Sequence, residues 1–123
     1  MTIEGFYEEV DGNYSEIYSR ISNEERIKKY LFIFLRDKTF TNLCLEINAN
    51  NTEKAFIYAH TLKELSQNLS LTPLYIQSQL ITKALRNNNF KKAILFLPKL
   101  GEEYSKVIIA IKKLETEELA GVK

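Results

Sequence analysis

Apolar residues recur every three to four positions along almost the whole chain of 123 residues. This spacing places them on one face of an α-helix, whereas a half-buried strand needs apolar and polar residues in alternation, and no sustained alternation is present. The four glycines and two prolines stand near the expected ends of helices. The pattern therefore predicts an all-α protein.

Helical periodicity covers the segments 21–37, 39–49, 50–71, 71–89 and 90–115. Ser22 and Glu25 have the spacing of a capping box at the first of these segments, and an asparagine cap is expected before residue 52. Thr72 is expected to cap the fourth segment, with Pro73 at its first helical position. Pro98 is expected to break or kink the last segment.

Short loops between long helices make neighbouring helices antiparallel. We therefore expect an up-and-down antiparallel four-helix bundle over residues 22–116, covered by short N-terminal capping helices within residues 1–20. Residues 117–123 are expected to fray, and 123 residues fit a single domain. The expected inner faces are Ala55, Ala59, Leu62, Ser66 and Leu69 in one helix and Leu74, Ile76, Leu80, Ile81 and Leu85 in the next.

Composition limits the classes of function. The net charge of +1 provides no long-range field to attract nucleic acid or an anionic membrane. One cysteine and one histidine allow neither an internal disulfide nor a nitrogen and sulfur metal site. The longest apolar run, residues 30–35, is too short to span a bilayer, and the first residues lack a signal-peptide pattern. We expect a cytoplasmic protein without a metal, and no binding to nucleic acid or membrane.

His60 is the only histidine, and helical geometry turns it away from the expected inner face. No serine or cysteine is placed beside it to form a nucleophilic triad, since Ser66 lies on another face. Two interpretations remain open. His60 is either a solvated helix residue, or its imidazole nitrogen carries a phosphoryl group whose charge Lys63 offsets.

The segment AHTLKELSQNLSL, residues 59–71, resembles the phosphohistidine segment of the histidine-containing phosphotransfer (HPt) domain family. In that family's pattern a histidine is followed three residues later by lysine and then directly by glycine, and a leucine-glycine pair ends the helix. His60 and Lys63 match the histidine and the lysine, and Leu69 and Leu71 match the terminal apolar positions. Residues 14–43, 71–90 and 93–114 are also similar to the family in helix length and spacing.

This resemblance implies a phosphorelay intermediate. His60 would accept a phosphoryl group from a receiver-domain aspartate and pass it to another receiver, and Lys63 would stabilise the phosphate. Gln67 could add a hydrogen bond, an expectation from helical spacing. The partners would be response-regulator receivers and a hybrid sensor histidine kinase. The chain would act as a monomer, without a cofactor or kinase activity of its own, and magnesium would be bound by the receiver.

The expected receiver-binding face comprises two adjacent helices, with Gln77 near its border; its residues are Phe56, His60, Lys63, Glu64, Gln67, Tyr75 and Gln79. Either Phe56 or Tyr75 would provide its apolar part, in keeping with the apolar centre and polar rim of such interfaces.

The chain departs from the family pattern at two positions, with Glu64 and Ser70 in place of the two glycines. Glu64 adds bulk and a negative charge where a phosphate has to be carried and an acidic receiver pocket has to dock. One alternative is therefore a degenerate HPt-like domain that binds receivers or sensor kinases without phosphotransfer. In that case Glu64→Gly should create or improve phosphate uptake. A structural interaction module, in which His60 is incidental, is the other alternative.

Overall fold

The computed structural model describes residues 1–121, and within them the chain forms seven α-helices and no strand. The helices are α1 (Ile3–Glu9), α2 (Tyr14–Arg20), α3 (Glu24–Leu35), α4 (Thr39–Asn48), α5 (Thr52–Asn68), α6 (Thr72–Arg86) and α7 (Phe90–Leu119). The prediction of an all-α protein is confirmed. The expected capping segment, residues 1–20, contains the two short helices α1 and α2.

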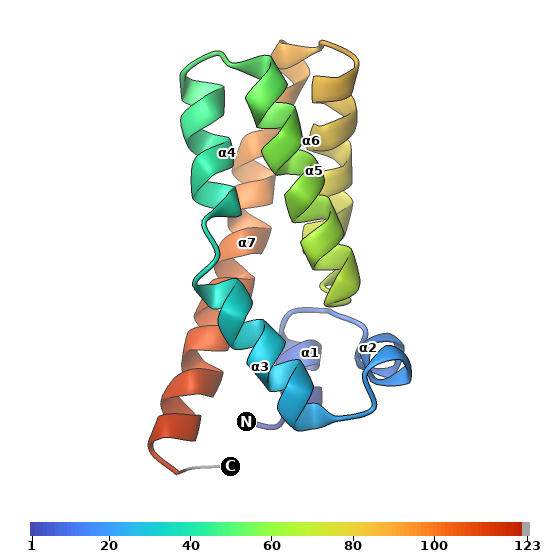
Figure 1. Cartoon of the computed structure of the whole chain (residues 1–123), viewed down its shortest axis with the longest axis vertical. Helices are drawn as coiled ribbons and strands as arrows, with labels where there is room; N and C mark the ends of the chain where they lie inside the picture. Colours follow the sequence, from blue (N-terminus) through green and yellow to red (C-terminus); the bar gives the residue numbers. More distant parts are fainter. Residues whose placement is uncertain (122–123) are drawn as a thin grey trace.

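Helices α4, α5, α6 and the first half of α7 lie side by side, and consecutive helices run in opposite directions (Figure 1). Helix α5 packs between α4 and α6, and α6 packs against α7. The second half of α7 extends past these helices and contacts α3 and α1. A short break at residues 36–38 separates α3 from α4, so the two follow each other along α7.

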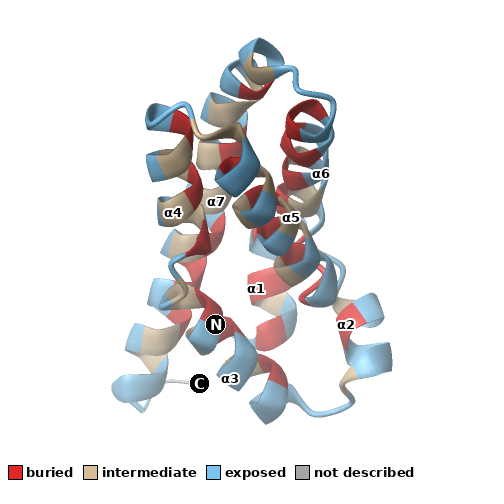
Figure 2. Ribbon diagram, turned by 45° about the horizontal axis from the view of Figure 1, so that its top comes forward, coloured by how far each residue is buried: buried red, intermediate tan, exposed pale blue. Residues whose placement is uncertain are grey.

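The core is one buried cluster that extends through the helices (Figure 2). The predicted inner face of α5 is confirmed, because all five of its residues are buried. The prediction for α6 is wrong at Ile76 and Leu80, which are 46% and 39% exposed, whereas Ser78 and Thr82 are buried. Ile76 lies about 200° around the helix from buried Leu74, so it points outward despite its apolar side chain.

Asparagines begin four of the helices, each accepting a hydrogen bond from the backbone N–H three residues on: Asn13, Asn23, Asn51 and Asn89. The expected asparagine cap before residue 52 is confirmed. The capping box at Ser22 is wrong, because Asn23 caps α3 and the Ser22 hydroxyl donates to the Tyr18 carbonyl at 3.0 Å.

The expected cap at Thr72 is also wrong. Leu71 is the N-cap residue of α6 and provides no side-chain hydrogen bond, so Thr72 is the first helical residue and Pro73 the second. The reason lies in the preceding helix. The Leu71 N–H closes the end of α5 by donating to the Ser66 carbonyl at 2.9 Å, and the chain leaves that turn directly into α6.

Four helices end with a non-glycine residue at positive φ, namely Asp11, Asn50, Ser70 and Asn88, with φ of 54–55°. After each, the next backbone N–H donates to a carbonyl five residues back, as Leu71 does to Ser66. This is the Schellman motif, in which the left-handed residue is most often glycine. Aspartate and asparagine tolerate that conformation better than other side chains do, which makes Ser70 the unusual member of the set.

Helix α7 continues through Pro98, so the helix break that was one of the two expected effects of this proline does not occur. Pro98 is exposed, so the Ile94 carbonyl that loses its helical partner can bond water instead. Although α7 has 30 residues, none of the helices in residues 1–121 combines the length and apolar character needed to cross a membrane.

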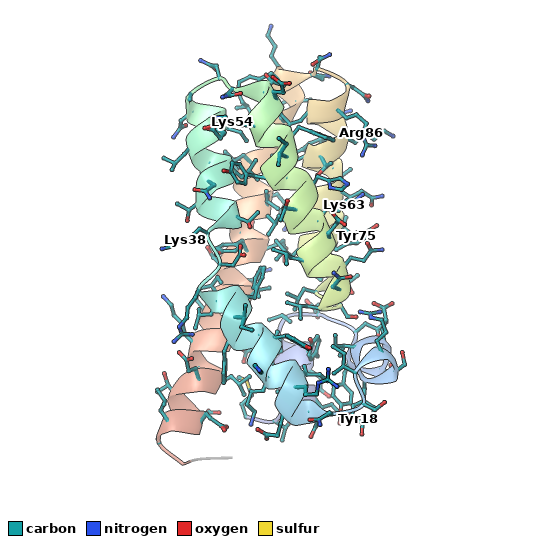
Figure 3. All side chains as sticks on the ribbon, viewed as in Figure 1. Tyr18, Lys38, Lys54, Lys63, Tyr75 and Arg86 are labelled. Atoms are coloured by element: carbon teal, nitrogen blue, oxygen red, sulfur yellow. The ribbon has the colours of Figure 1, made fainter. Side chains whose placement is uncertain are left out.

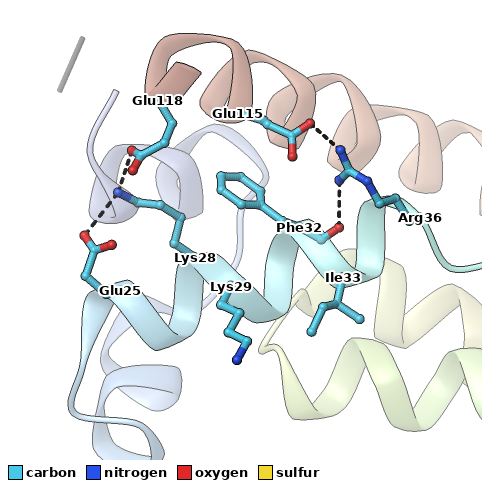
Figure 4. Close-up of a pocket in the computed structure, with 8 residues that line it drawn as sticks. All are labelled: Glu25, Lys28, Lys29, Phe32, Ile33, Arg36, Glu115 and Glu118. Carbon is cyan, nitrogen blue, oxygen red and sulfur yellow. Dashed lines mark hydrogen bonds and ion pairs between the residues drawn. The ribbon is translucent and has the colours of Figure 1, made fainter. Parts of the chain in front are cut away.

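The expected frayed tail, residues 117–123, is helical as far as Leu119, and Val122 and Lys123 lie outside the described residues. Two ion pairs hold this end of α7 against α3 (Figure 4). Lys28 Nζ lies 2.9 Å from Glu118, and Arg36 Nη2 lies 2.9 Å from Glu115. Local helix propensity does not include these contacts with α3, which is why the sequence predicted a frayed end.

The N-terminal helices are attached to the end of α5 through Tyr7. Its buried hydroxyl donates to the Leu69 carbonyl at 2.7 Å. Burial raises the pKa of the Tyr7 phenol well above its ordinary value of 10.0, and the nearby Arg20 charge only partly opposes this rise. The folded protein therefore retains this proton at pH values where the unfolded chain releases it.

We predict that Tyr7→Phe lowers the free energy of unfolding at pH 7 by about 1–2 kcal/mol, because the Leu69 carbonyl loses its partner. Above about pH 10 the unfolded chain binds fewer protons than the folded one. The stabilisation that the Tyr7 proton provides is therefore complete below about pH 10, and it declines as the pH rises further. The variant should therefore lose less stability than wild type between pH 7 and about pH 11. Urea unfolding at both pH values measures the free energy of unfolding of each protein. An identical loss of stability in wild type and variant would contradict the prediction.

Candidate functional site

Helix α5 carries His60 near its middle, between the Asn51 cap and the Schellman turn at Ser70. The His60 side chain is 39% exposed, so it borders the solvent without being free of neighbours. Its ring lies 5.9 Å from the Phe56 ring, centroid to centroid, with a tilt of 39° between the planes. Both side chains belong to the outer surface of α5, as the spacing of four residues requires.

The Glu64 carboxylate lies one helical turn beyond His60, with Oε1 2.9 Å from Nδ1 of the imidazole. An ionised carboxylate is only an acceptor and repels a lone pair, so an oxygen at this distance favours a hydrogen on Nδ1. In the neutral ring the lone pair then belongs to Nε2, and no hydrogen bond within residues 1–121 occupies that nitrogen. Nε2 is therefore the nitrogen available to react.

Arg86 is a member of the site that the sequence analysis missed. Its guanidinium carbon lies 5.6 Å from the centroid of the Phe56 ring, on the helix that packs against α5. Figure 3 shows Arg86, Lys63 and Tyr75 along the side of the molecule formed by α5 and α6. Arg86 is 26 residues from His60, so no spacing rule for a single helix could indicate this cation.

Lys63 is half-buried on α5, and its ammonium makes no ion pair or hydrogen bond within residues 1–121. That ammonium is therefore available to an anion at His60. Gln67 is exposed one further turn along, and its side chain likewise forms no hydrogen bond in the described part of the chain. The expected hydrogen bond from Gln67 to the ring or to a bound phosphate stays a prediction.

Tyr75 and Gln79 lie on α6, Tyr75 half-buried and Gln79 exposed. Among the described residues no hydrogen bond or ring contact joins either of them to His60. The two helices also expose apolar side chains that the sequence analysis did not select, with Ile57 56% and Ile76 46% exposed. The outer surface of α5 and α6 is thus a mixture of apolar, cationic and amide groups.

Ser70, at the second departure from the family pattern, is buried and has φ of 55°. A left-handed residue at a helix end is the conformation that favours glycine, which explains the glycine of the pattern. The Ser70 hydroxyl donates to Glu16 Oε1 at 2.7 Å and accepts from Arg20 Nη2 at 2.7 Å. Two side chains of α2 therefore compensate for the backbone strain.

The residues that could bind a metal or react as a thiol are few. Residues 1–121 contain no group of three or more histidine, cysteine, aspartate or glutamate side chains placed to bind a metal ion. Cys44 is half-buried, and burial raises the pKa of its thiol, which holds it in the less reactive neutral form.

Comparisons with protein-family models, with curated proteins and with solved structures give no match for this chain. A function has to be argued from the residues and their geometry.

We predict that Ser70→Ala lowers the free energy of unfolding by about 1–3 kcal/mol, because it keeps the strained φ and removes a hydroxyl that bonds two charged groups. Ser70→Gly should cost less, since glycine adopts this φ without strain. Asn88 provides the matched control, because it has the same φ at the end of α6 and its side chain forms no hydrogen bond in residues 1–121. Urea unfolding of alanine and glycine variants at both sites separates the effect of the lost hydroxyl from the effect of the strained backbone. Equal effects of alanine at Ser70 and Asn88 would contradict a stabilising hydroxyl.

Proposed function

We propose that this protein is a phosphorelay intermediate, in which His60 accepts a phosphoryl group from the aspartate of a receiver domain and passes it to another receiver. The observation that carries the proposal is the setting of His60: the side chain is half-exposed, and its Nδ1 lies 2.9 Å from the Glu64 carboxylate, which leaves Nε2 on the other side of the ring. The resemblance of residues 59–71 to the HPt phosphohistidine segment provides the reaction class.

The chemistry is a direct phosphoryl transfer. The Nε2 lone pair of His60 attacks phosphorus, a nitrogen–phosphorus bond forms, and the bond from phosphorus to the aspartate oxygen breaks. The electron pair of that bond leaves with the aspartate carboxylate. Nδ1 keeps its hydrogen, so the ring becomes cationic beside the Glu64 carboxylate, and the Lys63 ammonium offsets the phosphoryl charge. Transfer to the next receiver is the reverse of these steps.

We also propose the four-helix bundle of an HPt-like domain for this chain. In this assignment α3 and α4 together form one side, and α5, α6 and α7 form the other three, with α1 and α2 as the N-terminal cap. The antiparallel order of α4 to α7 and the stacking of Phe40 on Tyr104, with ring centroids 4.2 Å apart, support it. The protein would act as a cytoplasmic monomer, with response-regulator receivers and a hybrid sensor histidine kinase as partners and magnesium on the receiver.

The proposed receiver-binding face keeps the residues expected from the sequence, with Tyr75 and Gln79 on α6 and the others on α5. Lys63 and Arg86 place two cations on this face beside the Glu64 carboxylate, and these cations complement an acidic receiver pocket. Ile57 and Ile76 add apolar surface beyond Phe56 and Tyr75. An apolar centre with a polar rim suits an interface of modest area and short lifetime.

A second candidate is a degenerate HPt-like domain that binds receivers or sensor kinases without accepting phosphate. One observation favours it: the Glu64 side chain is 59% exposed on the proposed docking face, where the family pattern has glycine. A carboxylate there opposes an acidic receiver pocket, because like charges that meet at an interface reduce affinity.

We predict that incubation with a phosphorylated receiver and magnesium adds one phosphoryl group to the wild-type chain. Intact mass and phosphorus NMR at alkaline pH should detect phosphohistidine, and His60→Gln should give none. His60→Gln must retain the circular dichroism spectrum of wild type for this comparison. Uptake only by Glu64→Gly would favour the degenerate domain. No uptake by any variant with several receivers would leave an interaction module in which His60 is incidental.

We further predict that Lys63→Ala slows phosphoryl uptake about tenfold, because a charge-assisted contact to the phosphoryl oxygens is lost. Lys54→Ala is the matched control, since it removes the same charge from the exposed surface of α5 two turns before the site. Initial rates of uptake under rapid quench measure the effect. Equal rates for the two variants would show that Lys63 does not contact the transferred group.

A further inference from the structure

Glu64 replaces a glycine of the family pattern, and its carboxylate is turned toward the imidazole of His60, 2.9 Å from Nδ1. We propose that Glu64 is a positioning residue for phosphoryl transfer, which holds the hydrogen on Nδ1 and so presents the lone pair of Nε2 to the incoming phosphorus. This inference rests on the proposed function. It reverses the role expected from the sequence, in which Glu64 opposes transfer.

The surroundings of His60 limit the orientations of its ring. Phe56 lies beside the ring from one turn before, and the Glu64 carboxylate lies 2.9 Å from Nδ1 from one turn after. Arg86 of α6 lies over the Phe56 ring at 5.6 Å and ties that aromatic side chain to the neighbouring helix. A flip of the imidazole would place a ring C–H where Nδ1 lies 2.9 Å from Glu64, so the carboxylate favours one of the two ring orientations.

The choice of nitrogen has chemical consequences. A neutral histidine in water prefers its hydrogen on Nε2, which leaves the lone pair on Nδ1, the nitrogen closer to the backbone and more hindered. A carboxylate beside Nδ1 favours the other tautomer, with the hydrogen on Nδ1 and the lone pair on Nε2. Glu64 thereby makes the accessible nitrogen the nucleophile.

The same carboxylate favours the phosphorylated ring. Once Nε2 has bonded phosphorus, the imidazole carries a positive charge and Nδ1–H becomes a stronger donor. A charge-assisted hydrogen bond to Glu64 then stabilises this product more than it stabilises the neutral ring. Lys63 and Arg86 provide positive charges around the site that offset repulsion between Glu64 and the phosphoryl oxygens. Glycine at this position would allow a closer approach of the receiver but would leave Nδ1–H without an acceptor.

Nitrogen-15 NMR of the full chain, labelled at histidine, tests the positioning directly. The spectra are recorded at alkaline pH, where free histidine is neutral. Wild type should show Nδ1 bonded to hydrogen and Nε2 with a free lone pair, whereas Glu64→Ala should shift toward the opposite tautomer. Glu64→Gln should retain part of the wild-type state through its amide oxygen. The matched control is Glu53→Ala, which removes an exposed carboxylate from α5 two turns before His60. The same tautomer in wild type and Glu64→Ala would overturn the inference.

Phosphoramidate as the donor tests the transfer without any receiver. Its nitrogen–phosphorus bond breaks, ammonia leaves with the electron pair, and a new bond forms to an imidazole nitrogen. Wild type and Glu53→Ala should be phosphorylated at Nε2, and Glu64→Ala should react about tenfold more slowly and give some Nδ1 product. Equal rates and equal products would overturn the role of Glu64 and leave the proposed function standing. A tautomer that depends on Glu64, with no phosphorylation by phosphoramidate or receivers, would overturn the proposed function and the transfer role together.

Discussion

The carboxyl end of α5 is the junction on which the arrangement of this protein depends. Helix ends leave backbone carbonyls without helical partners, and such groups cannot be covered by protein unless they are bonded. Here the N-terminal segment bonds them: Tyr7 to Leu69, Arg20 to Gln67 and Asn68, and the Asn13 N–H to Ser70. Helices α1 and α2 therefore act as a cap for α5, and they fix the turn through which the chain enters α6. Ser70 can keep its left-handed φ because α2 bonds its hydroxyl.

His60 depends on this junction only indirectly, because its closest partners belong to its own helix. Spacing of four residues brings Phe56 and Glu64 to either side of the ring, whatever the neighbouring helices do. Helix α6 adds a positive charge, because its Arg86 packs over the Phe56 ring. In the proposed function, a local contact would select the reactive nitrogen, whereas packing would set the electrostatic surroundings of the phosphoryl group.

The far end of the molecule is organised by ion pairs between α3 and α7. Arg36 is exposed, and exposed pairs contribute little free energy. Lys28 is more enclosed and contacts two carboxylates, Glu25 at 3.3 Å and Glu118 at 2.9 Å, which raise the pKa of its ammonium. These contacts set where the end of α7 lies more than they stabilise the fold. These pairs join α3 to α7 and do not involve His60 or its neighbours on α5.

The sequence alone determined the helical class, the buried face of α5 and the neighbours of His60 on its own helix, because each follows from interactions that span three or four residues. It did not determine the starts of α3 and α6, the exposure of Ile76 and Leu80, or the helical end of α7. These depend on how one helix is rotated against another and on backbone turns that neighbouring elements stabilise. The sequence determined the position of Glu64 in part, and the tertiary structure decided the rest. Helical spacing placed it one turn from His60, but only the side-chain geometry of the folded chain decided that its carboxylate lies 2.9 Å from Nδ1.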